Sequence, residues 1–443
     1  MSEYIGQLDV VINGRIIGHI TRPRPGAEAV FDYTDDYVAN GKTPISTRIP
    51  ITTTTTRWKT LHPFLEGLLP EDPATRRRWA DNMSLTVDDS LGIINYFGWD
   101  CPGAIQITDR DRVAAMLERP SGLVPLTPSD IEDRIRLLRN DRASWTKEGE
   151  HWSLAGQQEK FALALRDGIW HTAEGSAPTT HIFKPGIGRL HHQALVEHLT
   201  MTAARNIGLD VAETQLVDFG NERVIVIERF DRYQSPNGHL ARIHQEDMAQ
   251  ATGVLPANKY ETHHGPGLER MAQVLNQHAQ RPEVELKLLA DFAIINYVAG
   301  APDGHAKNVS IQLVEDDVIL APQYDLATEF PYDLRGTDGF REVAVSIGGH
   351  RKLGQVLGKH WDRAARQIGI APEWMRSRVK AIAENYPDAF ATALAEVDDP
   401  AALMVAERAL DRMGGHSKDV LSRLDDAPDA PSVKRKRNTT DLS

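Results

Sequence analysis

The stretch Gly300-Ala301-Pro302-Asp303-Gly304-His305-Ala306-Lys307-Asn308 decides how this chain is interpreted. It holds an aspartate and an asparagine with four residues between them, and a second aspartate follows in Pro322-Gln323-Tyr324-Asp325. Phosphoryl transfer from ATP needs one carboxylate that accepts the proton of the attacking hydroxyl. It also needs a carboxylate and an amide oxygen that hold Mg²⁺. Asp303, Asn308 and Asp325 fit these roles in that order.

Other parts of a nucleotide site precede this stretch. The predicted strand 180–184 ends in Lys184, which can hold phosphates, and Glu197 on the next predicted helix can orient that lysine. The segment 153–160 stands where a loop that covers the phosphates belongs, although it contains only one glycine. The apolar segment 224–231 suits the join between two lobes, with Asp231 placed to reach a ribose.

Each of these features alone has an ordinary explanation. Asp and Asn in loops most often form turns, and isolated motifs give many false positives. Lys184 at a strand end and Glu197 on a helix face can simply be solvated, and Glu228 with Arg229 can be a structural ion pair. His305 can contact phosphate or brace its loop, and we favour the bracing role. The order of the parts along the chain is what favours a kinase.

Composition limits the classes of function. The chain has 443 residues, 41% of them hydrophobic and 25% charged, which is typical of about two or three globular domains. The net charge of −12 gives little non-specific attraction to nucleic acid or anionic membranes. Cys101 is the only cysteine, which excludes an internal disulfide and a cysteine-based zinc site. Without a signal peptide or an apolar run of membrane-spanning length, we expect a cytoplasmic protein with a buried, reduced thiol.

The first part of the chain, 1–110, is predicted to be a small mixed α/β domain. Asn13-Gly14 between two β-rich runs predicts a hairpin. Further strands are expected at 28–33, 43–51 and 103–107, a helix at 61–69, and an edge strand or exposed loop at 52–56. The segment 111–150 is predicted to be a helical connector, with a helix starting after Thr127.

The segment 151–420 changes from strands to helices, which predicts an α+β, two-lobed, protein-kinase-like fold. Strands are expected at 160–165, 180–184, 213–218 and 223–228, and helices at 192–207, 284–299 and 373–413. A short strand pair is expected around the Asp303–Asp325 site. The tail 425–443, with the basic run 434–437, is predicted to be disordered.

At this point the sequence resembles the HipA family of bacterial serine/threonine kinases, the toxins of type II toxin–antitoxin modules. The similarity covers about residues 1–420. The matching segments are Ser153-Leu-Ala-Gly-Gln-Gln-Glu-Lys160, Thr179-Thr-His-Ile-Phe-Lys184, Ile227-Glu-Arg-Phe-Asp-Arg232, Gln245-Glu-Asp-Met248, Lys259-Tyr-Glu261, Gly265-Pro-Gly267, Asp303-Gly-His-Ala-Lys-Asn308, Tyr324-Asp325, Leu68-Leu-Pro70 and Gly103-Ala104.

The resemblance implies a role for each matching residue. Asp303 is the base, Asn308 and Asp325 are the Mg²⁺ ligands, Lys184 binds phosphate with Glu197 orienting it, and Ser153 is an autophosphorylation site. A phosphoserine placed beside Asp303 and Asp325 would be repelled by their charges, which would push the loop out and switch the kinase off. The ATP-binding residues implied are Ala155, Gly156, Gln157, Gln158, Glu159, Lys160, Lys184, Glu228, Arg229, Phe230, Asp231, His305, Ala306, Lys307, Asn308, Tyr324 and Asp325.

The resemblance also implies partners. These are a small helix-turn-helix, HipB-like antitoxin, operator DNA bound through that antitoxin, and a protein substrate such as glutamyl-tRNA synthetase, whose inhibition gives growth arrest and persistence. Pro302 departs from the family, where a threonine often stands, and we expect activity to survive because Pro302 carries no catalytic atom. Two alternatives stay open: an inactive homologue that serves as a binding module in a repressor complex, and transfer of another group, such as AMP.

Overall fold

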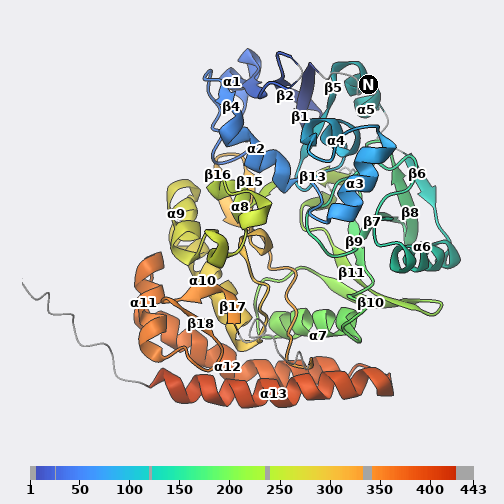
Figure 1. The fold of residues 1–443 in the computed structure, drawn as a ribbon. Coiled ribbons are helices and arrows are strands. Elements are labelled where there is room, and N and C mark those ends of the chain that lie inside the picture. The colour runs from blue at the N-terminus through green and yellow to red at the C-terminus, as the bar shows by residue number, and fades with distance from the viewer. Residues whose placement is uncertain (1–5, 25, 119–121, 235–239, 333–341, 426–443) are drawn as a thin grey trace, which may run out of the picture.

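The computed structural model describes residues 6–24, 26–118, 122–234, 240–332 and 342–425. Figure 1 shows an N-terminal domain at the top, a β-rich lobe beside and below it, and a helical lobe that ends at the bottom in α12 (Pro372–Leu394) and α13 (Pro400–Leu424). This is the expected α+β, two-lobed arrangement. Except for its first residue, the tail predicted to be disordered lies outside the described residues.

The N-terminal domain is built on a five-stranded antiparallel sheet in the order β4-β3-β2-β1-β5. The predicted hairpin at Asn13-Gly14 is confirmed, and both residues have positive φ, 49° and 79°, as a tight turn between twisted strands requires. The strands are β1 (Gln7–Ile12), β2 (Arg15–Thr21), β3 (Val30–Tyr33), β4 (Thr56–Arg57) and β5 (Ile105–Asp109). The helices are α1 (Asp35–Asn40), α2 (Trp58–Gly67), α3 (Pro73–Asn82), α4 (Ser90–Phe97) and α5 (Arg110–Glu118).

The strand predicted at 43–51 is wrong. This segment contains only one isolated bridge, between Ser46 and Ile49. Pro44 and Pro50 bracket it and lack the N–H groups that a ladder needs, so it forms a loop whose isoleucines are buried. The following threonines form the exposed loop and short edge strand that the sequence predicts.

The connector is not purely helical. It contains β6 (Gly122–Pro125), which pairs with β8 (Ile169–Glu174) at the edge of the second sheet. Its helix α6 (Pro128–Asn140) begins as predicted at Thr127, in a capping box with Asp130, and packs against the same sheet. Residues 122–150 therefore belong to the β-rich lobe, because β6 forms its backbone hydrogen bonds with β8 and α6 packs against the same sheet.

The β-rich lobe holds a six-stranded sheet in the order β10-β11-β9-β7-β8-β6. Its strands β7 (Phe161–Arg166), β9 (His181–Lys184), β10 (Thr214–Phe219) and β11 (Glu222–Glu228) confirm the four predicted strands. The strand β8 was not predicted from the sequence. The signal was present, because Asp167-Gly168 is a favoured hairpin turn and both residues have positive φ.

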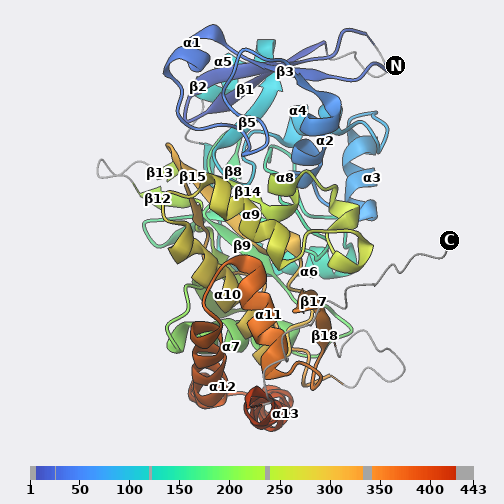
Figure 2. The ribbon, with the colours of Figure 1, turned by 90° about the vertical axis from the view of Figure 1, so that its left-hand side faces the viewer.

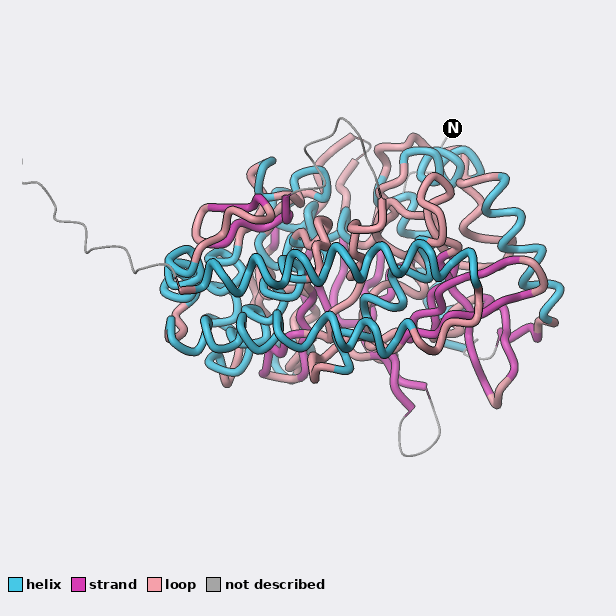
Figure 3. Tube along the Cα trace, turned by 90° about the horizontal axis from the view of Figure 1, so that it is seen from below, coloured by secondary structure: helices cyan, strands magenta, loops and turns pink. Residues whose placement is uncertain are grey.

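The helical lobe follows, linked to the sheet by α7 (Gln193–Asn206), which confirms the predicted helix. Figure 2 shows α10 and α11 in front of α7, and Figure 3, seen from below, shows the long helices α12 and α13 side by side nearest the viewer. The further elements are β12 (Arg232–Gln234), β13 (Leu240–Arg242), β14 (His244–Asp247), α8 (Met248–Thr252), α9 (Leu268–His278), α10 (Pro282–Val298), β15 (Ser310–Val314), β16 (Asp317–Leu320), β17 (Glu342–Ile347), β18 (His350–Lys352) and α11 (Gly358–Ile368).

The hydrophobic cores do not follow the expected domain boundary. One continuous cluster joins side chains of the N-terminal domain, such as Val10 and Phe64, to side chains of the six-stranded sheet, such as Phe161 and Phe183. The helical lobe has its own cluster around Leu289. The N-terminal domain and the β-rich lobe are therefore packed as one unit. Cys101 lies inside it, where burial raises the pKa of the thiol to about 12 and keeps it protonated. Among the described residues, no helix is long and apolar enough to cross a membrane.

Candidate active site

A cleft lies between the sheet and the helical lobe, and it has two adjoining parts that share Ala155, Lys160, Lys307 and Asp325. The first part is a pocket with apolar walls, where the rings of Phe230 and Tyr324 lie 5.6 Å apart. Further apolar walls are Leu154, Ile182 and Ile227. The second part is a polar cleft of about 1000 Å³, lined by Asp303, Asn308 and the segment 155–160. A ligand with a flat apolar ring and a charged chain would find a matching surface for each part here.

Lys184 stands at the centre of the site, at the end of β9. Its ammonium group donates to Glu197 at 2.8 Å and also to Asp325. Burial alone would lower the pKa of Lys184, but the carboxylates of Asp325 and Glu197 outweigh burial and raise it above its ordinary value. Glu197 is fully buried on α7 and does not line the cleft, as expected for a group that orients the lysine. The lysine is therefore charged and held in one position.

Asp303 lies at the floor of the polar cleft. Its side chain is 59% accessible to water, yet cleft walls surround it at longer range, and this burial together with Asp325 raises the pKa of its carboxyl group to about 6. The hydroxyl of Tyr260 donates a 2.5 Å hydrogen bond to Asp303 Oδ1, which opposes that rise. A carboxylate that is accessible and has a raised pKa is suited to accept a proton.

The ring of His305 is buried and packs edge-on against Tyr260, with 4.8 Å between the ring centroids. Burial lowers the pKa of His305 to about 3, so the ring is neutral. Among the described residues, its Nδ1 atom is buried without a hydrogen-bond partner, and the ring also lines the polar cleft. The bracing role therefore stays a prediction, which the packing against Tyr260 supports.

Asn308 and Asp325 provide oxygen atoms in the same cleft. Asn308 donates from Nδ2 to the carbonyl of Asp303 at 2.7 Å, which leaves its amide oxygen for another partner. Asp325 has φ of 59°, and although burial opposes it, the charges of Lys184 and Lys160 hold the pKa of its carboxyl group far below the ordinary value. A carboxylate and an amide oxygen are hard ligands that suit Mg²⁺, which takes its remaining ligands from phosphate and water. The residues therefore fit the ion that the family implies.

The segment 153–160 forms a loop over the cleft. The ammonium group of Lys160 donates to the carbonyl of Ala155 at 2.7 Å, and Gly156 has φ of 103°, where a Cβ atom would come within 2.6 Å of that ammonium. Burial and the neighbouring Lys184 lower the pKa of Lys160 to about 8. The loop thus brings a lysine that is still mostly protonated near pH 7, and turned backbone, to the site, which is suited to receive an anion.

Ser153 does not line the cleft. Its side chain is fully buried, its hydroxyl donates to the carbonyl of Leu68 at 2.6 Å, and its amide donates to the carbonyl of Asp100 at 3.1 Å. In this conformation the hydroxyl is closed off from any nucleotide. The loop would have to leave its place for Ser153 to be modified.

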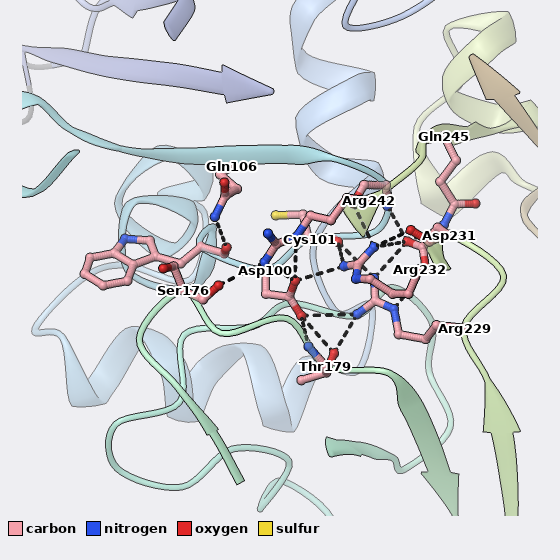
Figure 4. Close-up of polar contacts among 12 residues, drawn as sticks. Asp100, Cys101, Gln106, Ser176, Thr179, Arg229, Asp231, Arg232, Arg242 and Gln245 are labelled. Carbon is pink, nitrogen blue, oxygen red and sulfur yellow. Dashed lines mark hydrogen bonds and ion pairs between the residues drawn. The ribbon is translucent and has the colours of Figure 1, made fainter. Parts of the chain in front are cut away.

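The expected hinge residues Glu228, Arg229 and Phe230 all border the apolar pocket. The guanidinium group of Arg229 is buried in a cluster with Asp100 and Asp231. Arg229 donates to Asp231 at 2.9 and 3.0 Å and lies 3.4 Å from Asp100 (Figure 4). The ordinary explanation, a structural ion pair at this position, holds for Arg229, although its partner is Asp231 and not Glu228.

The expectation that Asp231 reaches a ribose is corrected. Asp231 borders the pocket, but its carboxylate accepts from the Gly103 amide at 2.6 Å and from Gln245 at 3.1 Å, besides Arg229 and Arg232. Asp231 is 2% exposed and is already paired with these groups, so its carboxylate is not presented to a ligand in this conformation. Ala306 is also fully buried and lines neither part of the cleft.

Most of the other expected residues lie where the sequence places them. The cleft is lined by Ala155, Gly156, Gln157, Gln158, Glu159, Lys160, Lys184, Lys307, Asn308, Tyr324 and Asp325. Three further residues lining it, Glu71, Lys259 and Tyr260, were not identified as site residues. Their signal was present in the segments Leu68-Leu-Pro70 and Lys259-Tyr-Glu261, but their meeting depends on tertiary structure.

Comparison with known proteins gives a consistent picture. Residues 8–108 match the HipA N-terminal domain, and residues 152–390 match the HipA-like C-terminal domain. The chain is 32% identical over 403 residues to a putative kinase, Y4mE, of Sinorhizobium fredii, covering 88% of this chain and 93% of that one. It is 26% identical to the serine/threonine-protein kinase toxin HipA of Shewanella oneidensis, covering 87% and 88%. Its fold matches a chain in a solved complex of HipA, HipB and operator DNA from Shewanella oneidensis MR-1, with a TM-score of 0.83, 24% identity and coverage of 96% and 99%.

Proposed function

The chain belongs to the HipA family, and from that premise we propose that it is a protein kinase that transfers the γ-phosphate of ATP to a serine or threonine hydroxyl. One observation carries this proposal. The Lys184–Glu197 pair and the three polar groups Asp303, Asn308 and Asp325 converge on one cleft, beside an apolar pocket of the kind that holds adenine.

The residues divide the work of the reaction among them. Adenine enters the apolar pocket, and Lys184 and the loop 155–160 hold the phosphates. The oxygen of the substrate hydroxyl bonds to the γ-phosphorus while the bond from that phosphorus to the leaving ADP oxygen breaks. Asp303 accepts the proton that the hydroxyl loses. Asn308 and Asp325 would hold Mg²⁺, which neutralises phosphate charge when bound. The pKa of Lys160 is lowered to about 8, and the negative charge of a bound phosphate would raise that pKa and hold the lysine fully protonated.

We extend the proposal to a toxin role. Shared family membership with a kinase toxin, and a fold shared with a HipA chain that was solved with HipB and operator DNA, support a HipB-like, helix-turn-helix antitoxin as partner, with DNA bound through it. An aminoacyl-tRNA synthetase, such as glutamyl-tRNA synthetase, is the proposed protein substrate, and its modification would cause growth arrest and persistence. Such a protein would act in the cytoplasm.

Ser153 is the proposed site of self-inactivation. Its buried hydroxyl donates a hydrogen bond to the carbonyl of Leu68, and a phosphate ester at this oxygen has no proton to donate there. The added charge of about −1.5 to −2 would face a carbonyl oxygen in a closed space, so the loop would be forced out of its place. A Ser153→Ala protein should keep its activity during incubation with ATP, while the wild type loses it.

Two other functions compete with this proposal. An inactive homologue would bind the antitoxin without transferring phosphate, but the intact set of Lys184, Asp303, Asn308 and Asp325 disfavours it. Transfer of AMP would use the same pocket with the nucleotide turned round, and the mass added to the product distinguishes it.

The test is incubation of purified wild type and Asp303→Gln with Mg²⁺ and γ-labelled ATP, followed by mass spectrometry. The proposal expects phosphate on the wild type, at Ser153, and none on the variant. If both proteins bind ATP and neither is labelled, the binding-module function is favoured. An added mass of AMP would favour adenylyl transfer.

A further inference from the structure

One acidic side chain from the N-terminal domain reaches into the polar cleft. Glu71 follows Pro70 at the end of the turn after α2, and its carboxylate is only 8% exposed. Its Oε2 atom lies 2.8 Å from Lys259 Nζ, while Oε1 is buried without a hydrogen bond, 3.9 Å from Lys307 Nζ. A carboxylate is costly to bury in this way, so its position calls for a reason.

On one side, the backbone of Glu71 holds the phosphate loop. Its amide donates to the carbonyl of Gly156 at 2.9 Å, and Pro70 forms a parallel bridge with Gly156. Leu68, in the same turn, accepts the hydroxyl of Ser153. The loop over the nucleotide is therefore fixed to the N-terminal domain at two points.

On the other side, the carboxylate of Glu71 holds the segment that contacts the base. Lys259, its ion-pair partner, lies over the ring of Tyr260 at 5.7 Å, and Tyr260 donates to the carboxylate of Asp303. The carbonyl of Lys259 also accepts from the amide of Ala306 in the catalytic loop at 3.4 Å. Glu71 is thus joined to the base through two intermediates.

We propose that Glu71 is a positioning residue, which sets the distance between the phosphate loop and the catalytic base. The inference rests on the proposed function of Asp303. The phosphate loop belongs to the β-rich lobe and the base to the helical lobe, so a third element that binds both fixes how far the cleft opens. Glu71 acts through Lys259 and Tyr260 and needs no contact with ATP.

The variant Glu71→Gln tests this proposal, because it removes the charge but keeps the backbone bond to Gly156. Loss of the Lys259 ion pair frees Tyr260 and lets the base drift. A displacement of about 1 Å at a reacting group can cost about 100-fold in rate, so kcat should fall about 10- to 100-fold. The KM for ATP should change less than about threefold, because the apolar pocket and the phosphate loop keep their contacts.

Matched variants separate this role from general damage. Asp81→Asn, an exposed carboxylate on α3 in the same domain, should leave kcat unchanged. The double variant Glu71→Gln/Lys259→Met should be no slower than Lys259→Met alone, because residues that act in one chain are not additive. A fully additive double variant, or a Glu71→Gln protein with normal kcat, would overturn the proposal.

Amide hydrogen exchange reads the same variants without relying on phosphate transfer. Faster exchange is expected at 259–263 and 303–308 in Glu71→Gln, with residues 153–160 unchanged. If the wild type transfers no phosphate, the proposed function fails, but the exchange measurement still tests whether Glu71 holds the segments 259–263 and 303–308 in place. Unchanged exchange at 259–263 would then contradict the positioning role.

Discussion

Two clusters of charged side chains lie close together in this molecule and differ in how completely they are paired. In the first, at the junction of the N-terminal domain and the hinge, Asp100 and Asp231 face Arg229, Arg232 and Arg242 (Figure 4). In the second, the cleft, Lys184 is fully paired, but Asp303 is accessible and the pKa of Lys160 is lowered to about 8. The two clusters use the same kinds of residue.

The junction cluster leaves little for a ligand to bind. Asp100 is fully buried and accepts from Thr179, at 2.8 Å to its hydroxyl and 3.0 Å to its amide, as well as from Arg232 and Arg242 at 2.9 Å each. Although burial opposes it, the three arginines hold the pKa of Asp100 far below its ordinary value. A satisfied buried network contributes to a unique fold, whereas accessible groups with shifted pKa values indicate chemistry.

The largest effect is expected in the cleft, from Asp325→Asn. Phosphate transfer should fall about 1000-fold or more, because the loss of the carboxylate proposed to hold Mg²⁺ would remove several kcal/mol of charge stabilisation. The fold should persist, because asparagine tolerates the positive φ at this position. Transfer rates measured across a range of Mg²⁺ concentrations check the loss of activity, and thermal unfolding checks that the fold persists. A variant with normal transfer at ordinary Mg²⁺ would remove Asp325 from the site.

At the junction, Asp100→Asn is expected to lower the stability of the fold and not the rate of phosphate transfer. Removal of the charge leaves three arginines buried against a single carboxylate, which typically costs about 3–5 kcal/mol of unfolding free energy. Chemical denaturation measures this loss. The control is Asp133→Asn, whose carboxylate is 68% exposed and pairs with Arg136 on the surface, and which should cost less than about 1 kcal/mol. Equal losses in the two variants would contradict the assignment of the junction as structural.

The contrast also shows what sequence can and cannot predict. Strands such as 180–184 and the Thr127 helix start depend on nearby residues, so they were predicted correctly. The role of Asp231 depends on Arg229 and on Gly103, more than 100 positions away, and no local pattern shows that pairing. The same holds for β6, whose partner strand begins more than 40 residues later.

The prediction of a strand at 43–51 was wrong for the opposite reason. Its isoleucines suggested a strand, but two prolines removed the hydrogen bonds that a ladder needs. Most residues predicted for the site line one cleft, because they stand on successive elements in a fixed order, while their roles stay predictions. Glu71 and Tyr260 were missed because each acts through a neighbour that only the fold provides.

A smaller effect concerns the pH dependence of transfer. The base acts only when ionised, and the pKa of Asp303 is about 6, so transfer should fall about tenfold for each pH unit well below that value. The hydrogen bond from Tyr260 lowers this pKa, so Tyr260→Phe should move the acidic limb to higher pH. Rates from pH 5 to 8 for both proteins check the shift. If the acidic limb of the rate profile stays in place or moves to lower pH in Tyr260→Phe, the hydrogen bond from Tyr260 to Asp303 does not lower the pKa of Asp303.

The most direct test of the comparison measures two variants, Asp303→Asn and Asp100→Asn, in both assays. We predict that Asp303→Asn loses about 100- to 10,000-fold in phosphate transfer and unfolds like the wild type. We predict that Asp100→Asn loses several kcal/mol of stability and keeps its transfer rate per folded molecule within about threefold. If Asp303→Asn transferred phosphate normally, or if Asp100→Asn lost transfer without losing stability, the division between a structural and a chemical cluster would be wrong.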